Sequence, residues 1–290
     1  MLDISLPAWG IWRPRTTAEQ AAEIEAIGFG ALWIPGQTAE IAGADELLAA
    51  TSSLIVGSSV VNVWAGDATT AGRSYHRLNE RFPDRFVLGI GIGHPELNQG
   101  FQSPLQAMTR YLDELDAAGV PVERRVIATL GPKMLTLAAK RAGGVIPYSV
   151  TPDWTRRARA AAGDDVVIAP EHKVVLNTDP ARARETNSEY MASMLRLRNY
   201  RTSLLRQGFT DDDLVGRGSD RLVDALVAHG NVSTVAAKLR EHVAAGADHV
   251  AIQVMCDTAP TMSDTPVPIS EDETFDVYRA LHDALVNDQR

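Results

Sequence analysis

The sequence is poor in cysteine, with Cys256 as the only one among 290 residues. One cysteine cannot form an intramolecular disulfide, and it excludes metal sites built from several cysteines. Because disulfides are typical of oxidising compartments, this composition predicts a cytoplasmic protein. The H-E-x-x-H, P-loop and G-x-S-x-G patterns are missing too. We therefore expect neither a metal centre nor hydrolysis by a serine nucleophile.

The sequence also lacks an excess of basic residues and any long apolar run. It has 28 Lys and Arg against 37 Asp and Glu, and this net charge of −9 disfavours a nucleic-acid partner. No apolar run approaches the roughly 18 residues that cross a membrane. The first residues, MLDISLPAWGIWRPR, show no basic stretch followed by an apolar one. We expect a small-molecule substrate and no nucleic-acid or membrane partner.

What the sequence does contain is a regular alternation of short apolar runs and helical patterns. Eight such repeats predict an α/β protein, a (β/α)₈ TIM barrel formed as one domain over residues 1–290. An open doubly wound sheet is the alternative, which the strand count disfavours. The expected strands are Asp3–Ala8, Ala31–Ile34, Ser53–Val61, Phe86–Ile92, Arg125–Leu130, Gly144–Tyr148, Val166–Leu176 and His249–Val254. The expected helices include Thr69–Arg81, Pro104–Ala118, Pro132–Ala142, Pro152–Ala162, Val232–Ala245 and Glu271–Asn287.

One segment departs from this alternation. Residues 179–230 lie between the seventh strand and its return helix, and their pattern is helical. We expect a helical insertion at the carboxyl-terminal face of the barrel, where insertions often cover a site. A packing or dimer element is the alternative reading of the same segment.

The segment LGPKM, residues 130–134, has the pattern of an anion site. Gly131 permits a tight turn, Pro132 begins a helix and Lys133 lies in its first turn. A lysine there opposes the helix dipole, and a bound anion would offset that cost. The pattern predicts phosphate binding at Gly131–Met134. The alternative is an ordinary turn with a solvated lysine.

The segment GIGIGHPELN, residues 89–98, ends the fourth expected strand. Gly91 and Gly93 carry no side chains there, so a flat ligand could approach the backbone, although the spacing is not that of a dinucleotide fingerprint. His94 follows and could act as a general acid near neutral pH. A surface or capping role is the alternative for His94.

The segment LIVGSSVVNVW, residues 54–64, places two serines inside an apolar run. Hydroxyl groups in a core strand cost stability unless they find hydrogen-bond partners. Periodicity alone marks this interruption and does not explain it.

Together these segments resemble the luciferase-like flavin and deazaflavin oxidoreductases, in particular the actinobacterial coenzyme F420-dependent members. The resemblance runs through GFGALWIP, SLIVGSSVVNVW, RFVLGIGIGHP, VIATLGPKMLTLAAKRAGGVIPY, LNTDPARAR, GFTDDDL, GSDRLVDALVAHG and AGADHVAIQV. It implies a barrel with a late insertion and a cofactor at the carboxyl-terminal face. It also implies a non-proline cis peptide bond, at Ser59–Val60, and a homodimer.

The resemblance implies roles for residues at the strand ends. Gly131–Met134 (Gly131, Pro132, Lys133 and Met134) would hold the cofactor phosphate, beside Pro147 and Tyr148. Ser59, Val60, Asn62, Gly91 and Gly93 would contact the ring, and Trp9, Gln37 and Trp64 would line the substrate pocket. His94 would be the proton donor, with Glu96 as a weaker neighbour. Two departures from the family are IPGQT, which has no histidine after the second strand, and His94 where relatives have glutamate.

The resulting expectation is an enzyme that transfers a hydride between coenzyme F420 and a small organic substrate. One alternative keeps the fold and uses FMN with O₂, as a monooxygenase. Another is a barrel that binds a flavin or deazaflavin without catalysis, because the histidine after the second strand is absent.

Overall fold

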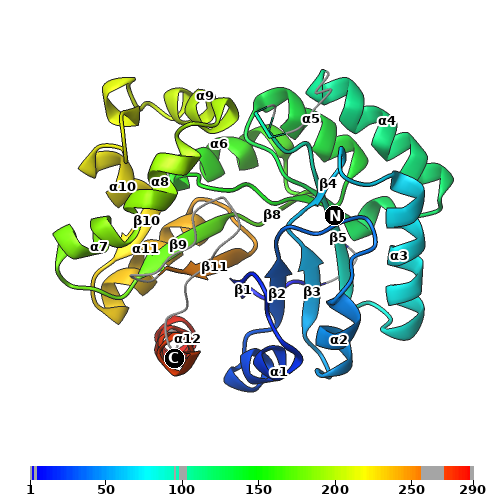
Figure 1. Ribbon diagram of the computed structural model, residues 1–290, viewed down its shortest axis with the longest axis horizontal. Coiled ribbons are helices and arrows are strands. Elements are labelled where there is room, and N and C mark those ends of the chain that lie inside the picture. Colours follow the sequence, from blue (N-terminus) through cyan, green and yellow to red (C-terminus); the bar gives the residue numbers. More distant parts are fainter. Residues whose placement is uncertain (1, 3–4, 95, 98–102, 256–270, 288–290) are drawn as a thin grey trace.

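The computed structural model describes residue 2 and residues 5–94, 96–97, 103–255 and 271–287. A parallel sheet curls through the middle of the molecule and helices cover its outer side (Figure 1). The strands are β1 (Trp9–Trp12), β2 (Ala31–Ile34), β3 (Ile55–Ser58), β4 (Val61–Asn62), β5 (Phe86–Gly91), β6 (Arg125–Ile127), β7 (Gly144–Val145), β8 (Val167–Ile168), β9 (Glu171–Val175), β10 (Val227–His229) and β11 (Val250–Val254).

The run 167–175 joins the two ends of this sheet. Its first part, β8, pairs with β7, and its second part, β9, pairs with β11, which in turn pairs with β1. The predicted (β/α)₈ barrel is therefore confirmed. The expectation of one unbroken strand over Val166–Leu176 is wrong, because the run is divided at Ala169 and Pro170. Proline has no N–H for a strand ladder, so pairing is interrupted there.

The first expected strand, Asp3–Ala8, is also misplaced. Asp3 and Ile4 lie outside the described residues, as does Cys256, and the strand itself is β1, Trp9–Trp12. Pro7 lies in the expected range and cannot donate to a ladder. As a consequence Trp9 begins the strand, beside Val250, instead of following it.

The helices are α1 (Ala18–Ile27), α2 (Ala44–Ala49), α3 (Ala68–Arg81), α4 (Pro104–Ala117), α5 (Pro132–Arg141), α6 (Pro152–Ala162), α7 (Pro180–Thr186), α8 (Ser188–Met194), α9 (Arg198–Arg206), α10 (Asp220–Leu226), α11 (Val232–Ala244) and α12 (Glu271–Asn287). Short 3₁₀ turns span Val122–Arg124 and Asp212–Leu214. Helix α1 begins with a capping box between Thr17 and Gln20 and ends at Gly28 in the left-handed region. Helix α2 was not predicted, since six residues show too little periodicity.

Alternate residues of the strands belong to two different apolar clusters. Leu32 and Ile34 of β2 pack in a cluster that includes helical residues such as Ile24. Ala31 and Trp33 of the same strand pack in a cluster with Val126 and other strand residues. The first cluster therefore lies between barrel and helices, and the second fills the barrel interior. In the part of the chain that the structure describes, no helix is long and apolar enough to cross a membrane.

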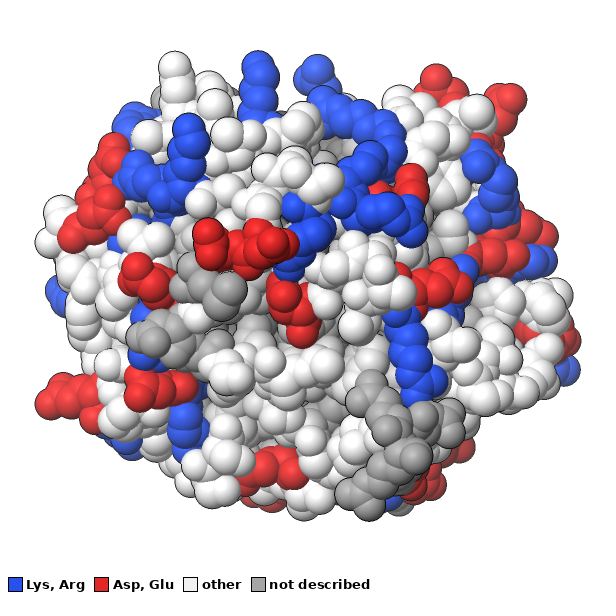
Figure 2. All heavy atoms as spheres, turned by 180° about the vertical axis from the view of Figure 1, so that it is seen from behind, with Lys and Arg blue, Asp and Glu red and all other residues white. Residues whose placement is uncertain are grey.

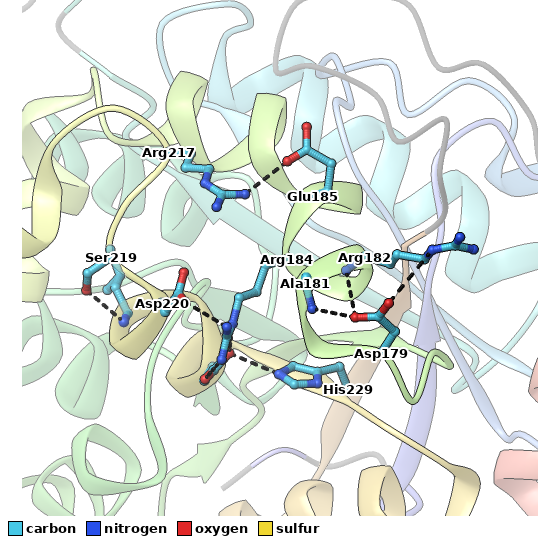
Figure 3. A network of polar contacts seen from close by, with 11 residues as sticks. Asp179, Ala181, Arg182, Arg184, Glu185, Arg217, Ser219, Asp220 and His229 are labelled. Atoms are coloured by element: carbon cyan, nitrogen blue, oxygen red, sulfur yellow. Dashed lines mark hydrogen bonds and ion pairs between the residues drawn. The ribbon is translucent and has the colours of Figure 1, made fainter.

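After β9 the chain forms α7, α8, α9 and α10, which gather on one side of the barrel (Figure 1). They share an apolar cluster of their own, which includes Tyr190 and Met194. Ion pairs tie the outer helices together: Arg184 of α7 reaches Asp220 at 2.7 Å, and Arg217 reaches Glu185 at 3.0 Å (Figure 3). The expectation that residues 179–230 are helical throughout is wrong at Val227–His229, because this segment is β10 and pairs with β9.

We expect one acid-sensitive contact near the amino-terminal end of β3. The Glu25 carboxylate accepts hydrogen bonds from the backbone N–H groups of Ser52, Ser53 and Leu54. Burial raises the pKa of Glu25, but these donors outweigh it and lower the pKa to about 2. A lowered pKa stabilises the fold above the unfolded value near 4.5, and this contribution is lost as the pH falls towards 2.

The Glu25→Gln variant should therefore lose less stability than the wild type between pH 4.5 and pH 2. Because Glu25 is partly exposed, the difference should be on the order of 1 kcal/mol. Urea denaturation at several pH values in this window measures it. Parallel pH curves for the two proteins would contradict the prediction.

Candidate functional site

A cavity of about 1160 Å³ lies at the carboxyl-terminal ends of the barrel strands. In Figure 1 the arrows of β2 and β3 point upward, towards the side where α5 and α9 lie. The walls of the cavity are formed by segments that follow the strands and by residues of the insertion. They are Trp12, Pro14, Arg15, Pro35, Gly36, Gln37, Ser59, Val60, Gly91, Ile92, Gly93, His94, Pro104, Ala128, Thr129, Leu130, Gly131, Met134, Ile146, Tyr148, Tyr190, Arg198, Asn199, Tyr200, Thr202, Arg206 and Gln253.

The serines that interrupt the third apolar run both have partners. The Ser58 hydroxyl donates to the Gly89 carbonyl at 2.9 Å and accepts from the Gly89 N–H at 2.8 Å. Trp12 donates from its indole Nε1 to the Ser59 hydroxyl at 3.0 Å. The next peptide bond, Ser59–Val60, is cis, which confirms the position expected from the resemblance. The hydroxyls thus connect the segment after β3 to β1 and β5.

A glycine is needed at position 91 for a different reason from the predicted one. A Cβ atom at this position would lie 2.4 Å from Cγ2 of Val60. The space beside Gly91 is therefore filled by the segment that contains the cis bond, and the glycine is needed for that close packing. Gly91 and Gly93 both line the cavity, and Gly93 has a φ of 63°, in the left-handed region.

The predicted phosphate turn lies at the edge of the cavity. Gly131 is the N-cap of α5 and makes no side-chain cap hydrogen bond, and Gly131 and Met134 both line the cavity. Pro132 and Lys133 are exposed and do not line it. The nearby cation is instead Arg206 of α9, whose Nη1 atom would lie 3.3 Å from a Cβ at Gly131. Sequence analysis missed Arg206 because only folding brings α9 next to α5.

His94 lines the cavity and is held by the insertion. Its Nδ1 atom lies 2.8 Å from Oδ1 of Asn199, and its ring centroid is 5.2 Å from that of Tyr200. Burial lowers the pKa of His94, while the bond to Asn199 and the charge of Glu96 oppose this, and the net shift is downward. His94 is therefore mainly neutral at pH 7. An amide oxygen only accepts, so Nδ1 carries the hydrogen and Nε2 is the basic atom.

Several other predicted site residues do not line the cavity. Trp9 is at the opposite end of β1, and Trp12 takes its expected place in the wall. Asn62 uses its Oδ1 to accept from the N–H of Trp64, and Trp64 donates from Nε1 to the Ile92 carbonyl. Glu96 and Pro147 do not line the cavity either. Glu96 accepts a hydrogen bond from the N–H of Arg198, where α9 begins, and Pro147 is buried. Gln37 does line the cavity, and its Nε2 donates to the Pro35 carbonyl.

Beneath the cavity lies a buried polar group that the sequence did not reveal. Residues of β9 alternate in direction, and Val174 packs on the helix side, so Glu171 and Lys173 face the barrel interior. Both are 1% exposed, and Lys173 Nζ lies 3.0 Å from Glu171 Oε2 and 2.9 Å from the Ser149 hydroxyl. The same Nζ lies 3.9 Å from the ring centroid of Tyr148. Tyr148 and Gln253 form the cavity wall above this pair.

Cationic side chains border the opening of the cavity. Arg198 and Arg206 both line it from α9 and are exposed. Other arginines of the insertion, such as Arg184, Arg217 and Arg221, have carboxylate partners. Among the described residues no ion pair involves Arg198 or Arg206. Figure 2 shows lysine and arginine side chains gathered mainly in the upper part of the molecule, where the carboxyl ends of the strands lie.

The described ranges contain no group of three or more His, Cys, Asp or Glu side chains that could hold a metal ion. The polar side chains of the cavity wall include arginines, one histidine, amides and hydroxyl groups. Such a set suits an anionic organic ligand with carbonyl groups.

Comparison with known proteins shows similarity to one family over part of the chain and to a relative over most of it. Residues 7–116 match the family described as luciferase-like monooxygenase. A Mycobacterium tuberculosis protein named "Putative coenzyme F420-dependent oxidoreductase Rv3520c" is 24% identical, over 84% of this chain and 92% of that protein. The resemblance predicted from the sequence is thus confirmed.

Two solved structures share the fold along nearly the whole chain. One is an F420-dependent secondary alcohol dehydrogenase in complex with an F420–acetone adduct. It has a TM-score of 0.71 and 12% identity, over 97% of this chain and 99% of that chain. The other is the oxygenating constituent of 3,6-diketocamphane monooxygenase of Pseudomonas putida in complex with FMN. Its TM-score is 0.66 at 12% identity, over 97% and 98% of the two chains.

Proposed function

We propose that this protein, which is similar to luciferase-like enzymes over the first part of its chain, transfers a hydride between coenzyme F420 and a small organic substrate. The observation that carries the proposal is the combination of two features in one cavity. An uncapped helix N-terminus lies beside Arg206, and Ser59 and Val60 share a wall of the cavity with the aromatic rings of Trp12 and Tyr148. The first feature suits a phosphate and the second a flat ring system.

The cavity is large enough for a cofactor together with a substrate. Pockets for small ligands usually measure roughly 300–1,000 Å³, and this one measures about 1160 Å³. Gly131 and the first turn of α5 would hold the phosphate with Arg206, and the wall around Val60 would contact the ring. Coenzyme F420 supplies a hydride donor or acceptor when it is bound. The chain supplies binding, orientation and one proton-transferring side chain.

The charge at the opening favours coenzyme F420 over FMN. The tail of coenzyme F420 continues beyond its phosphate into several carboxylates, whereas FMN ends at its phosphate. Arg198 and Arg206 have no ion pair among the described residues, and with Arg206 at the phosphate, Arg198 remains available to such carboxylates. Guanidinium groups bind carboxylates and phosphates with strong charge-assisted hydrogen bonds. Arg198 would therefore give the longer anion one partner more than the shorter one.

His94 is the side chain that would move a proton. Its Nδ1 donates to Asn199, so its Nε2 accepts a proton from a substrate hydroxyl when a carbinol is oxidised, and returns it to the oxygen in the reverse direction. The hydride leaves the carbinol carbon in the same reaction, so the substrate loses one hydride and one proton. The expected role of His94 as a proton donor therefore belongs to the reductive direction.

Titration of the purified protein with coenzyme F420 and with FMN, followed by tryptophan fluorescence, tests the proposal. Tight binding of coenzyme F420 and weaker binding of FMN are expected. Tight FMN binding without coenzyme F420 binding would indicate the monooxygenase alternative. Bound coenzyme F420 should also change its absorbance with some member of a panel of alcohols and carbonyl compounds. No change with any member would indicate a non-catalytic barrel.

The Arg206→Gln variant should bind coenzyme F420 about tenfold more weakly at low salt, because one charge-assisted contact to the anionic tail is lost. The difference should shrink at high salt, since screening weakens exposed charges. Arg196→Gln is the matched control, because Arg196 is an exposed arginine of the insertion outside the cavity wall. Equal losses in the two variants, or no loss with Arg206→Gln, would remove Arg206 from the binding site.

A further inference from the structure

Gln253 of β11 presents a hydrogen-bond donor to the cavity. The residue is 4% exposed and belongs to the cavity wall. Its Oε1 atom accepts from the hydroxyl of Tyr148 at 2.8 Å. Its Nε2 atom makes no hydrogen bond with any residue that the structure describes. This nitrogen is not among the described side-chain atoms that are buried without a partner, so it is open to the cavity, where a ligand oxygen can accept from it.

The orientation of this amide is fixed from below. Tyr148 donates its hydroxyl hydrogen to Gln253, so the amide oxygen faces Tyr148 and the two N–H bonds point away from it. The Tyr148 ring in turn rests 3.9 Å above Lys173 Nζ, in cation–π contact. Lys173 cannot move freely, because Glu171 and Ser149 hold the same nitrogen. The chain Glu171–Lys173–Tyr148–Gln253 therefore places one neutral donor in the cavity.

We propose that Gln253 is a specificity residue that binds a neutral carbonyl or hydroxyl oxygen of a ligand, and that Lys173 is a positioning residue that acts through Tyr148. The proposal rests on the proposed function and deepens it. Two ligands could supply the oxygen. One is a carbonyl of the cofactor ring, and the other is the reacting oxygen of the substrate. A negatively charged group does not fit as well, because Nε2 is uncharged and the arginines lie at the opening.

The test compares wild type with Gln253→Leu, which removes the donor at similar volume. Gln106→Leu is the control, because Gln106 is exposed on α4 and does not line this cavity. Two quantities are measured for each protein: the dissociation constant and absorption spectrum of bound coenzyme F420, and the KM of the substrate. The phosphate-free deazaflavin chromophore serves as a second probe, since it carries the ring carbonyls without the tail.

A lost neutral hydrogen bond changes affinity by about three- to tenfold. If the oxygen belongs to the ring, Gln253→Leu weakens binding of coenzyme F420 and of the chromophore by the same factor and shifts the absorption maximum. If it belongs to the substrate, ring binding stays unchanged and KM rises by that factor. Either result supports the proposal and identifies the source. If the ring affinity and the KM of Gln253→Leu both stay within twofold of the wild-type values, the proposal is overturned.

The part assigned to Lys173 has a separate test. The double variant Glu171→Gln/Lys173→Met removes both buried charges and keeps the volumes. The double variant should reproduce a part of the Gln253→Leu effect on whichever quantity that variant changes, the affinity for the ring or the KM of the substrate. Combined with Gln253→Leu it should add nothing further, because both changes act on one contact. Additive losses would show that Lys173 acts only on general stability, and would overturn its positioning role.

The two levels of the proposal fail differently. A wild type that binds neither coenzyme F420 nor its chromophore contradicts the proposed function and this inference together. If the wild type binds coenzyme F420 and turns over substrate, and the Gln253→Leu variant behaves identically, only this inference is contradicted.

Discussion

Replacement of His94 by alanine should reduce turnover by about 10²- to 10⁴-fold, the range expected for loss of a general acid or base. The dissociation constant of coenzyme F420 should change little, since the predicted anion contacts lie at Gly131 and Arg206. The loss should appear in kcat more than in KM. Steady-state kinetics with fluorescence titration separate these quantities. Turnover within about twofold of wild type would mean that His94 transfers no proton.

The pH profile gives a second measure of the same residue. Burial lowers the pKa of His94, so the neutral base predominates above a midpoint that lies under 6.5. Oxidation of an alcohol, which needs this base, should be constant above the midpoint and fall as the pH drops through it. His94→Ala should abolish this dependence.

Two further variants define the cause of the profile. Asn199→Leu removes the acceptor at 2.8 Å that favours the charged imidazole, so the midpoint should move to lower pH. His76→Ala is the matched control, because His76 is an exposed residue of α3 outside the cavity wall. A midpoint that moves upward in Asn199→Leu would contradict the assigned hydrogen bond.

The largest effect on stability should come from Lys173→Met. This change leaves the Glu171 carboxylate buried without its cation, and breaking a buried pair in this way typically costs 3–5 kcal/mol. Burial already raises the pKa of Glu171, and Lys173 opposes that rise. Without the lysine the pKa rises further. In the variant, Glu171 then keeps its proton in the folded state at a pH where the unfolded state has released it. The loss of stability should therefore be larger at pH 8 than at pH 5.

Urea denaturation of Lys173→Met and of the double variant Glu171→Gln/Lys173→Met measures this effect. The double variant should recover most of the stability, because no charge is left unpaired. Lys238→Met is the matched control, since Lys238 forms a partly exposed pair with Glu241 at 3.2 Å and should cost less than about 1 kcal/mol. Equal costs for Lys173→Met and Lys238→Met would contradict the assignment of a buried ion pair.

The sequence predicted the fold better than the position of the site. Apolar runs located most strands because both faces of a barrel strand are covered. Two of the errors have a common local cause. Pro7 and Pro170 lie inside apolar runs but cannot donate to a ladder, so one strand was misplaced and another was taken as unbroken. The strand Val227–His229 was hidden because it directly continues the helical pattern of α10.

At the site, the sequence identified residues near strand ends and missed those that arrive from elsewhere. Gly131, Met134, His94, Gln37 and Tyr148 were assigned to the site from the sequence, and all five line the cavity. Arg206 and Asn199 come from the insertion, and no local pattern connects them to the turns they approach. Lys173 was missed for another reason: a lysine inside an apolar strand gives no sign of which face it occupies until the strand register is known. The resemblance supplied the cis bond, which periodicity could not locate.

The run 167–175 bears on how this protein could be engineered. The same nine residues close the barrel, carry Glu171 and Lys173, and pair with β10, which is the last element of the insertion. Excision of residues 179–230 would remove β10 and expose one edge of β9, together with the residues outside the insertion that pack in its apolar cluster, such as Val175 and Met255. The insertion is therefore no detachable module. Shortened versions for crystallography or domain exchange should keep the chain from β8 to α11 intact.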